Sequence, residues 1–515
     1  MRKLEKLQIL KNVGSSWFSL GVNVLTGLFL SPFILHRLGD SAYGIWVLIF
    51  SVTGYYGLFD LGIRTSIVRY VSKFVATEEK ENLAKLINTS LLSYACIGVV
   101  SMLVTLGVCA FMDRLFRIPA EFHSTARLLF LMVGASVALG FPLGVFGGVL
   151  EGLQRFYIMN WTSATASLLR TALIIIVMNH GYGLVTVALI TVALPLVSSI
   201  VRGAVALRIL RIGFGFHYLD GTIFRLIANY SGITFIVLVA GRLRFRTDEI
   251  VIGGLLTASA ITYFSIGARI VDYASEVVSS LAQIFVPMSS DSHAKGDMDR
   301  MRKIMIAGNR ACAFIILPIA AILIIVGKSV IEAWVGSKYI AQSYPVLVIL
   351  IIPFTLMLAQ SASGRILFGT SQHKTFAIVA LVEGLANLIL SLLLVRPYGI
   401  VGDALGTAIP LSCTMLVFMP RHVCRTLGIE IPTFLREAYT LPLVACMPMV
   451  IVLLLMQHWI VPHGYRQLAA QLLTAGMVYG AGLLWMYRTN RAFRVGDLSP
   501  ANRIESQTCR LNSEG

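Results

Sequence analysis

Charged residues are scarce in this sequence. Asp, Glu, Lys and Arg make up only 13% of its 515 residues, whereas hydrophobic residues make up 57%. An average soluble domain carries about 25% charged residues. The mean hydropathy of +0.80 is too high for a protein whose whole surface faces water. An ordinary soluble globular protein is therefore excluded.

Nucleotide-binding and catalytic motifs are also missing. The sequence has no P-loop, no G-x-G-x-x-G ahead of a helix, no H-E-x-x-H and no G-x-S-x-G. The segments between its apolar runs are short, and the longest, near 64–85, 202–223, 276–304 and 488–515, cannot hold a catalytic domain. We therefore predict that the protein is not an enzyme. Any transport would be driven by gradients, by substrate flux or by a partner protein.

Cysteine spacing gives no sign of a metal site. The seven cysteines are odd in number and scattered, at Cys96, Cys109, Cys312, Cys413, Cys424, Cys446 and Cys509. They imply no disulfide framework, and we interpret them as small apolar fillers. No cofactor or metal is expected.

What the sequence has in abundance is long apolar runs. A membrane-spanning helix needs about 20 mostly apolar residues. We predict an all-α polytopic membrane protein with about fourteen transmembrane helices. Their expected positions are near 14–35, 41–63, 86–111, 127–150, 157–179, 183–207, 224–243, 249–275, 305–327, 343–364, 374–395, 399–420, 437–459 and 467–487.

The formal net charge of +17 is explained by the orientation of the chain in a membrane rather than by nucleic-acid binding. If the N-terminus is cytoplasmic, most Lys and Arg residues fall in the segments on the inner side. This asymmetry is the positive-inside rule, and it predicts that both termini are cytoplasmic. Arg170, Arg269 and Arg310 fall inside predicted helices instead.

The chain also repeats itself. Tyr182-Gly183 recurs as Tyr398-Gly399, and Ser41-Ala42 recurs as Ser259-Ala260 at nearly the same separation. Two parallel six-helix lobes are one architecture of secondary transporters, with the substrate site between them. The predicted divisions are lobes at 1–215 and 216–430, two further helices at 431–490 and a cytoplasmic tail at 491–515. Chance similarity between apolar helices is the alternative.

Four groups of residues, spread in order from about residue 12 to residue 420, resemble a known family. They are Gly57–Ile63 with Arg69-Tyr70-Val71, Gly148–Phe156 with Asn160, Arg246–Gly253 with Tyr263-Phe264-Ser265, and Glu383–Asn387 with Tyr398–Gly402 and Gly406-Thr407. The pattern resembles Wzx-type polysaccharide (O-antigen) flippases of the multidrug/oligosaccharidyl-lipid/polysaccharide exporter superfamily. Asp403 and the Arg242–Arg246 run depart from the family pattern.

The resemblance implies a function in lipopolysaccharide biosynthesis. Such proteins move undecaprenyl-pyrophosphate-linked oligosaccharide from the inner to the outer leaflet of the bacterial inner membrane by alternating access. The implied partners are this substrate, membrane lipids, an H⁺ or Na⁺ coupling ion, and glycan polymerase and chain-length proteins. Arginine suits the pyrophosphate because its planar fork donates two parallel hydrogen bonds.

Charges inside a membrane are costly and therefore mark candidate sites. Asp60 and Arg64 are four residues apart and would share one helix face. They form either a cavity-facing pair at the cytoplasmic mouth or a structural clamp. Arg269 has Asp272 three residues on, so it is either a cavity cation or half of a neutralised pair. Arg170 has no partner nearby in sequence, so it must face water, an anion or an acidic residue of another helix, and we predict that it lines the cavity.

Two further groups complete the candidates. Arg246, with Arg242 and Arg244, would receive the pyrophosphate or glycan on the outer side, or would lie in a solvated loop. Glu383 and Asp272 are the candidates for binding the coupling ion. For Glu383 the alternative is a hydrogen bond to Asn387, four residues on.

Two other functions compete with a flippase. A cation-coupled multidrug exporter of the same superfamily would be expected to use acidic cavity residues, whereas the intramembrane set here holds several arginines. A membrane enzyme such as a glycan polymerase or ligase would be expected to carry a large outer loop. The outer loops here are short, so we favour the flippase.

Overall fold

A computed structural model of the chain describes residues 2–210, 212–227, 239, 241–244, 247–369, 373–459 and 464–489. All regular elements in these ranges are helices, which confirms the all-α prediction. Helices suit a bilayer because they satisfy every backbone hydrogen bond within one segment. The contacts divide the chain into two compact units. Unit 1 comprises Met1–Ser265 and Ala380–Asp403, and unit 2 comprises Ile266–Val379 and Ala404–Gly515.

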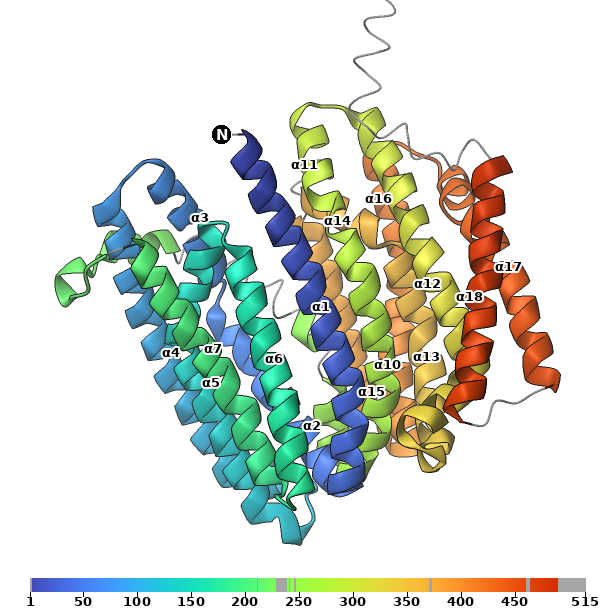
Figure 1. Cartoon of the computed structure of the whole chain (residues 1–515), viewed down its shortest axis with the longest axis horizontal. Helices are drawn as coiled ribbons and strands as arrows, with labels where there is room; N and C mark the ends of the chain where they lie inside the picture. Colours follow the sequence, from blue (N-terminus) through green and yellow to red (C-terminus); the bar gives the residue numbers. More distant parts are fainter. Residues whose placement is uncertain are drawn as a thin grey trace, which may run out of the picture. The chain divides into compact units, whose positions relative to one another are not determined.

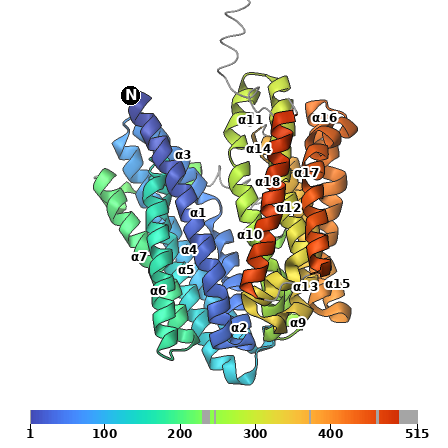
Figure 2. The ribbon, with the colours of Figure 1, turned by 45° about the vertical axis from the view of Figure 1, so that its right-hand side comes forward.

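Unit 1 is a bundle of long helices. In Figures 1 and 2, α4 to α7 run side by side. Its elements are α1 (Arg2–Leu38), α2 (Asp40–Gly54), η1 (Tyr55–Asp60), α3 (Ile63–Ala76), α4 (Lys80–Leu115), η2 (Ala120–Phe122), α5 (His123–Gly152), α6 (Phe156–Asn179), α7 (Leu184–Leu210), η3 (Phe216–Tyr218), α9 (Asp248–Leu255), the start of α10 (Ala258–Ala282) and the middle of α15 (His373–Cys413).

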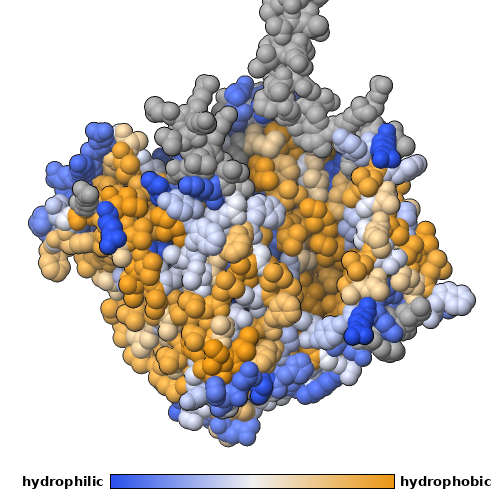
Figure 3. All heavy atoms as spheres, viewed as in Figure 1, coloured by the Kyte–Doolittle hydropathy of each residue, from blue (hydrophilic) through white to orange (hydrophobic). Residues whose placement is uncertain are grey.

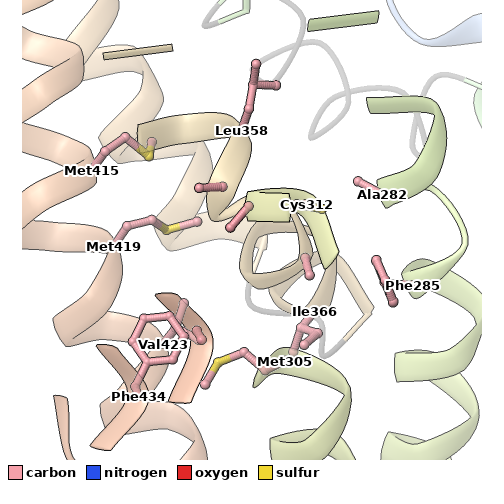
Figure 4. Close-up of a cluster of buried hydrophobic side chains, with 14 of the residues drawn as sticks. Ala282, Phe285, Met305, Cys312, Leu358, Ile366, Met415, Met419, Val423 and Phe434 are labelled. Carbon is pink, nitrogen blue, oxygen red and sulfur yellow. The ribbon is translucent and has the colours of Figure 1, made fainter. Parts of the chain in front are cut away.

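Unit 2 contains the rest of α10 and α15 and the helices between and after them. These are α11 (Phe285–Ala294), α12 (Met298–Val335), η4 (Ser337–Tyr339), α13 (Ile340–Ala359), α14 (Ser361–Gly369), the π-helical turn η5 (Thr414–Phe418), α16 (Met419–Leu427), α17 (Ile431–Trp459) and α18 (Tyr465–Thr489). An apolar cluster in unit 2 joins residues of α10, α11, α12, α13, α14, α15, η5, α16 and α17. Met305 and Cys312 of α12, Ile366 of α14 and Phe434 of α17 lie within that cluster (Figure 4).

Eleven helical segments among the described residues are long and apolar enough to cross a membrane. They include the first six predicted spans, while residues 374–395 and 399–420 fall in one segment, Ile378–Leu427. Much of the predicted seventh span lies outside the described residues. Fourteen crossings therefore stay a prediction. Over α4 to α7 the surface is broadly hydrophobic, with hydrophilic residues gathered toward the helix ends (Figure 3), as a lipid-facing surface requires.

Two predicted spans are broken in the structure. The span predicted at 41–63 changes to a 3₁₀ turn at Tyr55 and stops at Leu61 and Gly62, whose φ angles are 52° and 80°. A positive φ suits glycine, which lacks a Cβ atom. Asp60 and Arg64 consequently lie on different elements, and the expectation of a shared helix face was wrong. The span predicted at 249–275 is likewise two helices, α9 and α10.

The long helix α15 is two helices joined at Gly399. This residue has φ 59° and ψ −140°, which is not helical. A Cβ atom at Gly402 would lie 2.0 Å from the carbonyl oxygen of Leu394, so the chain folds back on itself here. The Ser391 hydroxyl donates to the backbone oxygen of Asp403 across this turn (3.3 Å). The predicted helix boundary near residue 398 is therefore confirmed, as a tight hairpin.

The predicted lobes at 1–215 and 216–430 do not coincide with the two contact units. Unit 1 takes in residues 216–265 and 380–403 as well as the predicted first lobe. A division by contacts does not test an internal repeat, because repeats are defined by chain order and pseudo-symmetry. The two six-helix lobes, the extra helices at 431–490 and the tail at 491–515 remain a prediction.

Candidate functional site

Arg64 forms a two-point ion pair with Glu151 in unit 1. Its Nη2 atom lies 2.9 Å from Oε1 of Glu151, and its Nε atom donates to Oε2 at 3.1 Å. A fork against a carboxylate is the strongest neutralising geometry available to arginine. Helices α3 and α5 pack closely here, since a Cβ atom at Gly148 of α5 would lie 3.1 Å from Cγ2 of Ile67 on α3. Arg64 keeps 42% of its side chain exposed.

Asp60 has a different partner. The buried hydroxyl of Tyr94 on α4 donates a hydrogen bond to Oδ1 of Asp60. The Tyr94 ring also stacks on Phe141 of α5, with 5.9 Å between centroids. The sequence pairs Asp60 with Arg64, whereas the structure gives each of them a partner from a neighbouring helix. Both are close to the break after η1.

Arg202 adds a second cation to this region. From α7 it donates to the Thr162 hydroxyl (2.8 Å), the Ser163 hydroxyl (2.6 Å) and the backbone oxygen of Met159 (3.3 Å), all on α6. These acceptors carry no formal charge. Arg202 lies within electrostatic reach of Arg64 and Glu151. Among the described residues it forms no salt bridge, so its charge is only partly balanced.

Of the predicted cations that the structure describes, Arg170 is the least compensated. Its Nη2 atom is 3.4 Å from the hydroxyl of Ser167, which in turn contacts Thr26 of α1 at 3.1 Å. Its Nε atom is buried and has no hydrogen-bond partner in the part of the chain that the structure describes. No salt bridge to Arg170 occurs within the same residues. A membrane helix thus holds a cation whose one described hydrogen bond is to a hydroxyl group.

Glu383 pairs with Arg244 in the interior of unit 1. The two side chains are 2% and 7% exposed and form an ion pair. Asn387 donates to the backbone oxygen of Arg244 (3.1 Å), and Ser391 donates to Asn387 Oδ1 (3.0 Å). Asn387 thus stabilises the segment that carries Arg244. Arg246, the predicted outer cation, lies outside the described residues.

The unexpected Asp403 lies beside this network. It is fully buried at the turn of the α15 hairpin and within electrostatic reach of Asp248 and Glu249. Arg269 and Asp272 belong to unit 2. Arg269 Nη1 is 3.9 Å from Asp272 Oδ2 on the same helix, α10, and the side chains are 40% and 36% exposed. That pair is the one expected from their spacing.

Helices α2 and α10 meet within unit 1 through small residues. A Cβ atom at Gly44 would lie 1.8 Å from the carbonyl oxygen of Ala258, so no larger residue fits. The Thr262 hydroxyl donates to the backbone oxygen of Asp40 (2.7 Å). Aligning Ser41 with Ser259 equates Asp40 with Ala258 and Gly44 with Thr262. The two contacts are therefore the same contact seen from either side, as in a two-fold interface.

The sequence pattern of the family described as "Polysaccharide biosynthesis protein" matches residues 9–293, more than half of the chain. The chain belongs to this family. The membrane protein EpsK of Bacillus subtilis (strain 168) is 24% identical over 437 residues, covering 81% of this chain and 83% of that protein. A Shigella flexneri protein named "Putative O-antigen transporter" is 20% identical, covering 81% of this chain and 99% of that protein.

Solved structures share the fold. A structure titled "Lipid II flippase MurJ, inward closed conformation" aligns with a TM-score of 0.68 and 18% identity, covering 93% of this chain and 99% of that chain. An inward-facing multidrug resistance MATE family transporter of the MOP superfamily aligns with a TM-score of 0.63 and 15% identity, covering 79% and 94%. The placement among Wzx-type proteins of this superfamily, made from the motifs, is confirmed.

The family match contains the cationic part of the site. Arg64, Glu151, Arg170 and Arg202 all lie within residues 9–293, whereas Glu383 and Asp403 follow the matched segment. Sequence reasoning missed Glu151, Tyr94 and Arg202 as members of the site. Glu151 was visible inside the motif Gly148–Phe156. Arg202 was placed in the connecting segment near 202–223, whereas α7 continues to Leu210.

Proposed function

We propose that this membrane protein is a flippase for undecaprenyl-pyrophosphate-linked oligosaccharide. It moves this substrate from the inner to the outer leaflet of the bacterial inner membrane by alternating access, with both termini in the cytoplasm. Family membership and the relative named as an O-antigen transporter support the substrate class. Glycan polymerase and chain-length proteins are the proposed partners, because they would consume the translocated product.

The observation that carries the proposal is the uncompensated charge of Arg170. A buried charge is costly unless it is paired, and a charge within a membrane helix commonly marks a substrate path. The one described hydrogen bond of Arg170 is to the hydroxyl of Ser167, and its Nε atom has no described partner. A pyrophosphate would supply the missing negative charge and several acceptor oxygens. A cationic drug would instead be repelled.

Arg64 and Arg202 extend the proposed anion path toward the inner side. The fork of Arg64 that holds Glu151 has the geometry that also binds a phosphate. Because Arg64 is 42% exposed, an incoming pyrophosphate can compete with Glu151 for that fork. Asp60, which accepts the hydrogen bond from Tyr94, would then fix the position of α4 beside the cytoplasmic mouth of the path. Arg269 and Arg246 complete our proposed substrate-binding set.

Glu383 and Asp272 remain our candidates for coupling to H⁺ or Na⁺. Each carboxylate faces a cation, Arg244 for Glu383 and Arg269 for Asp272. Protonation of either carboxylate would release its arginine, so ion binding and the availability of a cation for the substrate would be linked. An ion gradient could then control whether these arginines are free to bind the pyrophosphate.

The self-equivalent contact between α2 and α10 supports alternating access. Gly44 and Ala258 touch backbone to backbone, and Thr262 bonds to Asp40. Small residues permit close helix approach within a membrane. Few side chains need to rearrange when such a contact separates. We propose that it closes one side of the path and opens once per transport cycle, about the pseudo-two-fold axis of the two predicted lobes.

The test is complementation of cells that lack this protein. Wild type should restore surface glycan, and Arg170→Ala should leave lipid-linked glycan on the inner leaflet, with the variant inserted at normal levels. Arg208→Ala is the matched control, because Arg208 is an exposed arginine in the last turn of α7. If deletion leaves surface glycan unchanged and sensitises cells to cationic drugs, the multidrug alternative replaces the flippase.

A further inference from the structure

A basic hollow at the junction of α16 and α17 is not used by the proposed transport path. It lies in unit 2, has a volume of about 490 Å³ and is lined by Arg421, Cys424, Arg425, Ile429, Glu430, Ile431 and Pro432. The lining combines two guanidinium groups with an apolar floor. Pockets that hold drug-sized ligands have volumes of about 300–1,000 Å³.

The two arginines are brought to the hollow by a short amphipathic helix. One face of α16, with Met419, Val423 and Leu427, is buried. Met419 and Val423 lie in the apolar cluster of unit 2 (Figure 4). Arg421 and Arg425 are exposed and one turn apart. The packing of the apolar face therefore fixes where both cations point.

Neither cation is balanced by the chain around it. Among the described residues, Arg421 and Arg425 form no salt bridge and no side-chain hydrogen bond. Like charges four residues apart on a helix repel each other. A third guanidinium lies close by, because Arg302 donates from Nε to the backbone oxygen of Leu427 (2.7 Å) at the end of α16. Glu430 is the one acidic side chain in the lining.

The turn at the end of α16 shapes the hollow. Gly428 has a φ angle of 64° and ends the helix, and the chain then passes through Ile429 to begin α17 at Ile431. Ile429 and Ile431 pack on the apolar cluster of unit 2. Pro432 adds a rigid apolar edge. A ligand here would meet cations on one side and hydrocarbon on the other.

We propose that this hollow binds an acidic phospholipid of the inner leaflet. The phosphate would sit between Arg421 and Arg425, whose guanidinium groups match phosphate oxygens, and the first carbons of the acyl chains would cover Ile429 and Ile431. The charge distribution along the chain places this connection on the cytoplasmic side, where anionic lipids attract juxtamembrane basic residues. The hollow is too small for a lipid-linked oligosaccharide, so the site is distinct from the transport path.

The test is a lipid titration of the full-length protein. The protein is prepared in phosphatidylcholine nanodiscs, fluorescent phosphatidylglycerol is added, and the dissociation constant is measured. Replacing both arginines, Arg421→Gln with Arg425→Gln, should weaken binding by about tenfold or more, since two charge-assisted contacts are lost. The control Arg208→Gln with Arg488→Gln removes the same charge at two exposed arginines. It should leave the dissociation constant within about twofold of wild type.

Three outcomes overturn the proposal. Equal binding by wild type and the Arg421/Arg425 variant would mean that the hollow holds no lipid. An equal loss in the control would mean a non-specific charge effect. Full competition by inorganic phosphate would assign the site to a soluble anion rather than a lipid. If the double variant does not fold, Arg425→Gln alone is titrated in the same way, and an unchanged dissociation constant would then refute the site.

Discussion

Two arginine–glutamate pairs in unit 1 have the same chemistry and opposite surroundings. In the pair between Arg244 and Glu383 the side chains are 7% and 2% exposed, whereas between Arg64 and Glu151 they are 42% and 24% exposed. A buried pair is strongly coupled to the fold, because removing one partner strands the other charge. A half-exposed pair is screened and contributes little to stability. We therefore expect the first pair to contribute most to stability, in addition to the coupling role proposed for Glu383, and the second pair to be open to exchange with a substrate anion.

Breaking the buried pair should have the largest effect. Glu383→Ala leaves the Arg244 guanidinium inside unit 1 without its carboxylate. We expect a loss of about 3–5 kcal/mol in the free energy of unfolding. Thermal unfolding of purified protein measures it, as a large drop in Tm or a loss of folded protein.

The control for this prediction removes both charges at once. Arg244→Met combined with Glu383→Leu keeps approximate volume and should recover most of the lost stability, because an apolar pair can replace a buried ion pair. If Glu383→Ala unfolds at the wild-type temperature, the pair is not structural. Transport by the stable double variant then separates a coupling role of Glu383 from a structural one.

The next prediction concerns Arg202, a cation that has no carboxylate partner among the described residues. Its described acceptors are Thr162, Ser163 and the backbone of Met159, all uncharged. Arg202→Gln can keep one or two of these hydrogen bonds and removes the charge. We expect stability to change by about 1 kcal/mol or less, while transport falls by about tenfold or more because one charge-assisted phosphate contact is lost. Lipid-linked glycan retained on the inner leaflet is the measurement.

A parallel variant keeps the charge at this position. Arg202→Lys has the cation without the fork and should transport at an intermediate rate. Equal transport by wild type and Arg202→Gln would remove Arg202 from the anion path and leave it as a link between α6 and α7.

The sequence was sufficient for the fold class and for the first six spans, because apolar runs and charge asymmetry are direct consequences of the bilayer. It did not predict the helix break between Asp60 and Arg64. Gly62 is an ordinary residue in an apolar run until its φ of 80° is known. The partners of Arg64 and Glu383 were equally hidden. The partner of Arg64 is Glu151 and the partner of Glu383 is Arg244, both distant in sequence. Helical spacing predicts only contacts within one helix.

Breaking the half-exposed pair should have the smallest effect on stability. Glu151→Gln keeps an oxygen acceptor near Arg64 and removes the competing carboxylate. We expect the free energy of unfolding to fall by about 1 kcal/mol or less, as for other exposed ion pairs. If Glu151 holds the fork of Arg64 until substrate arrives, the variant should bind pyrophosphate more tightly than wild type. Its transport should fall because the bound substrate leaves Arg64 more slowly. Titration of inorganic pyrophosphate into the purified protein measures the first effect, and release of lipid-linked glycan to the outer leaflet measures the second. Weaker pyrophosphate binding together with a large loss of stability would place this pair in the same class as Arg244 and Glu383.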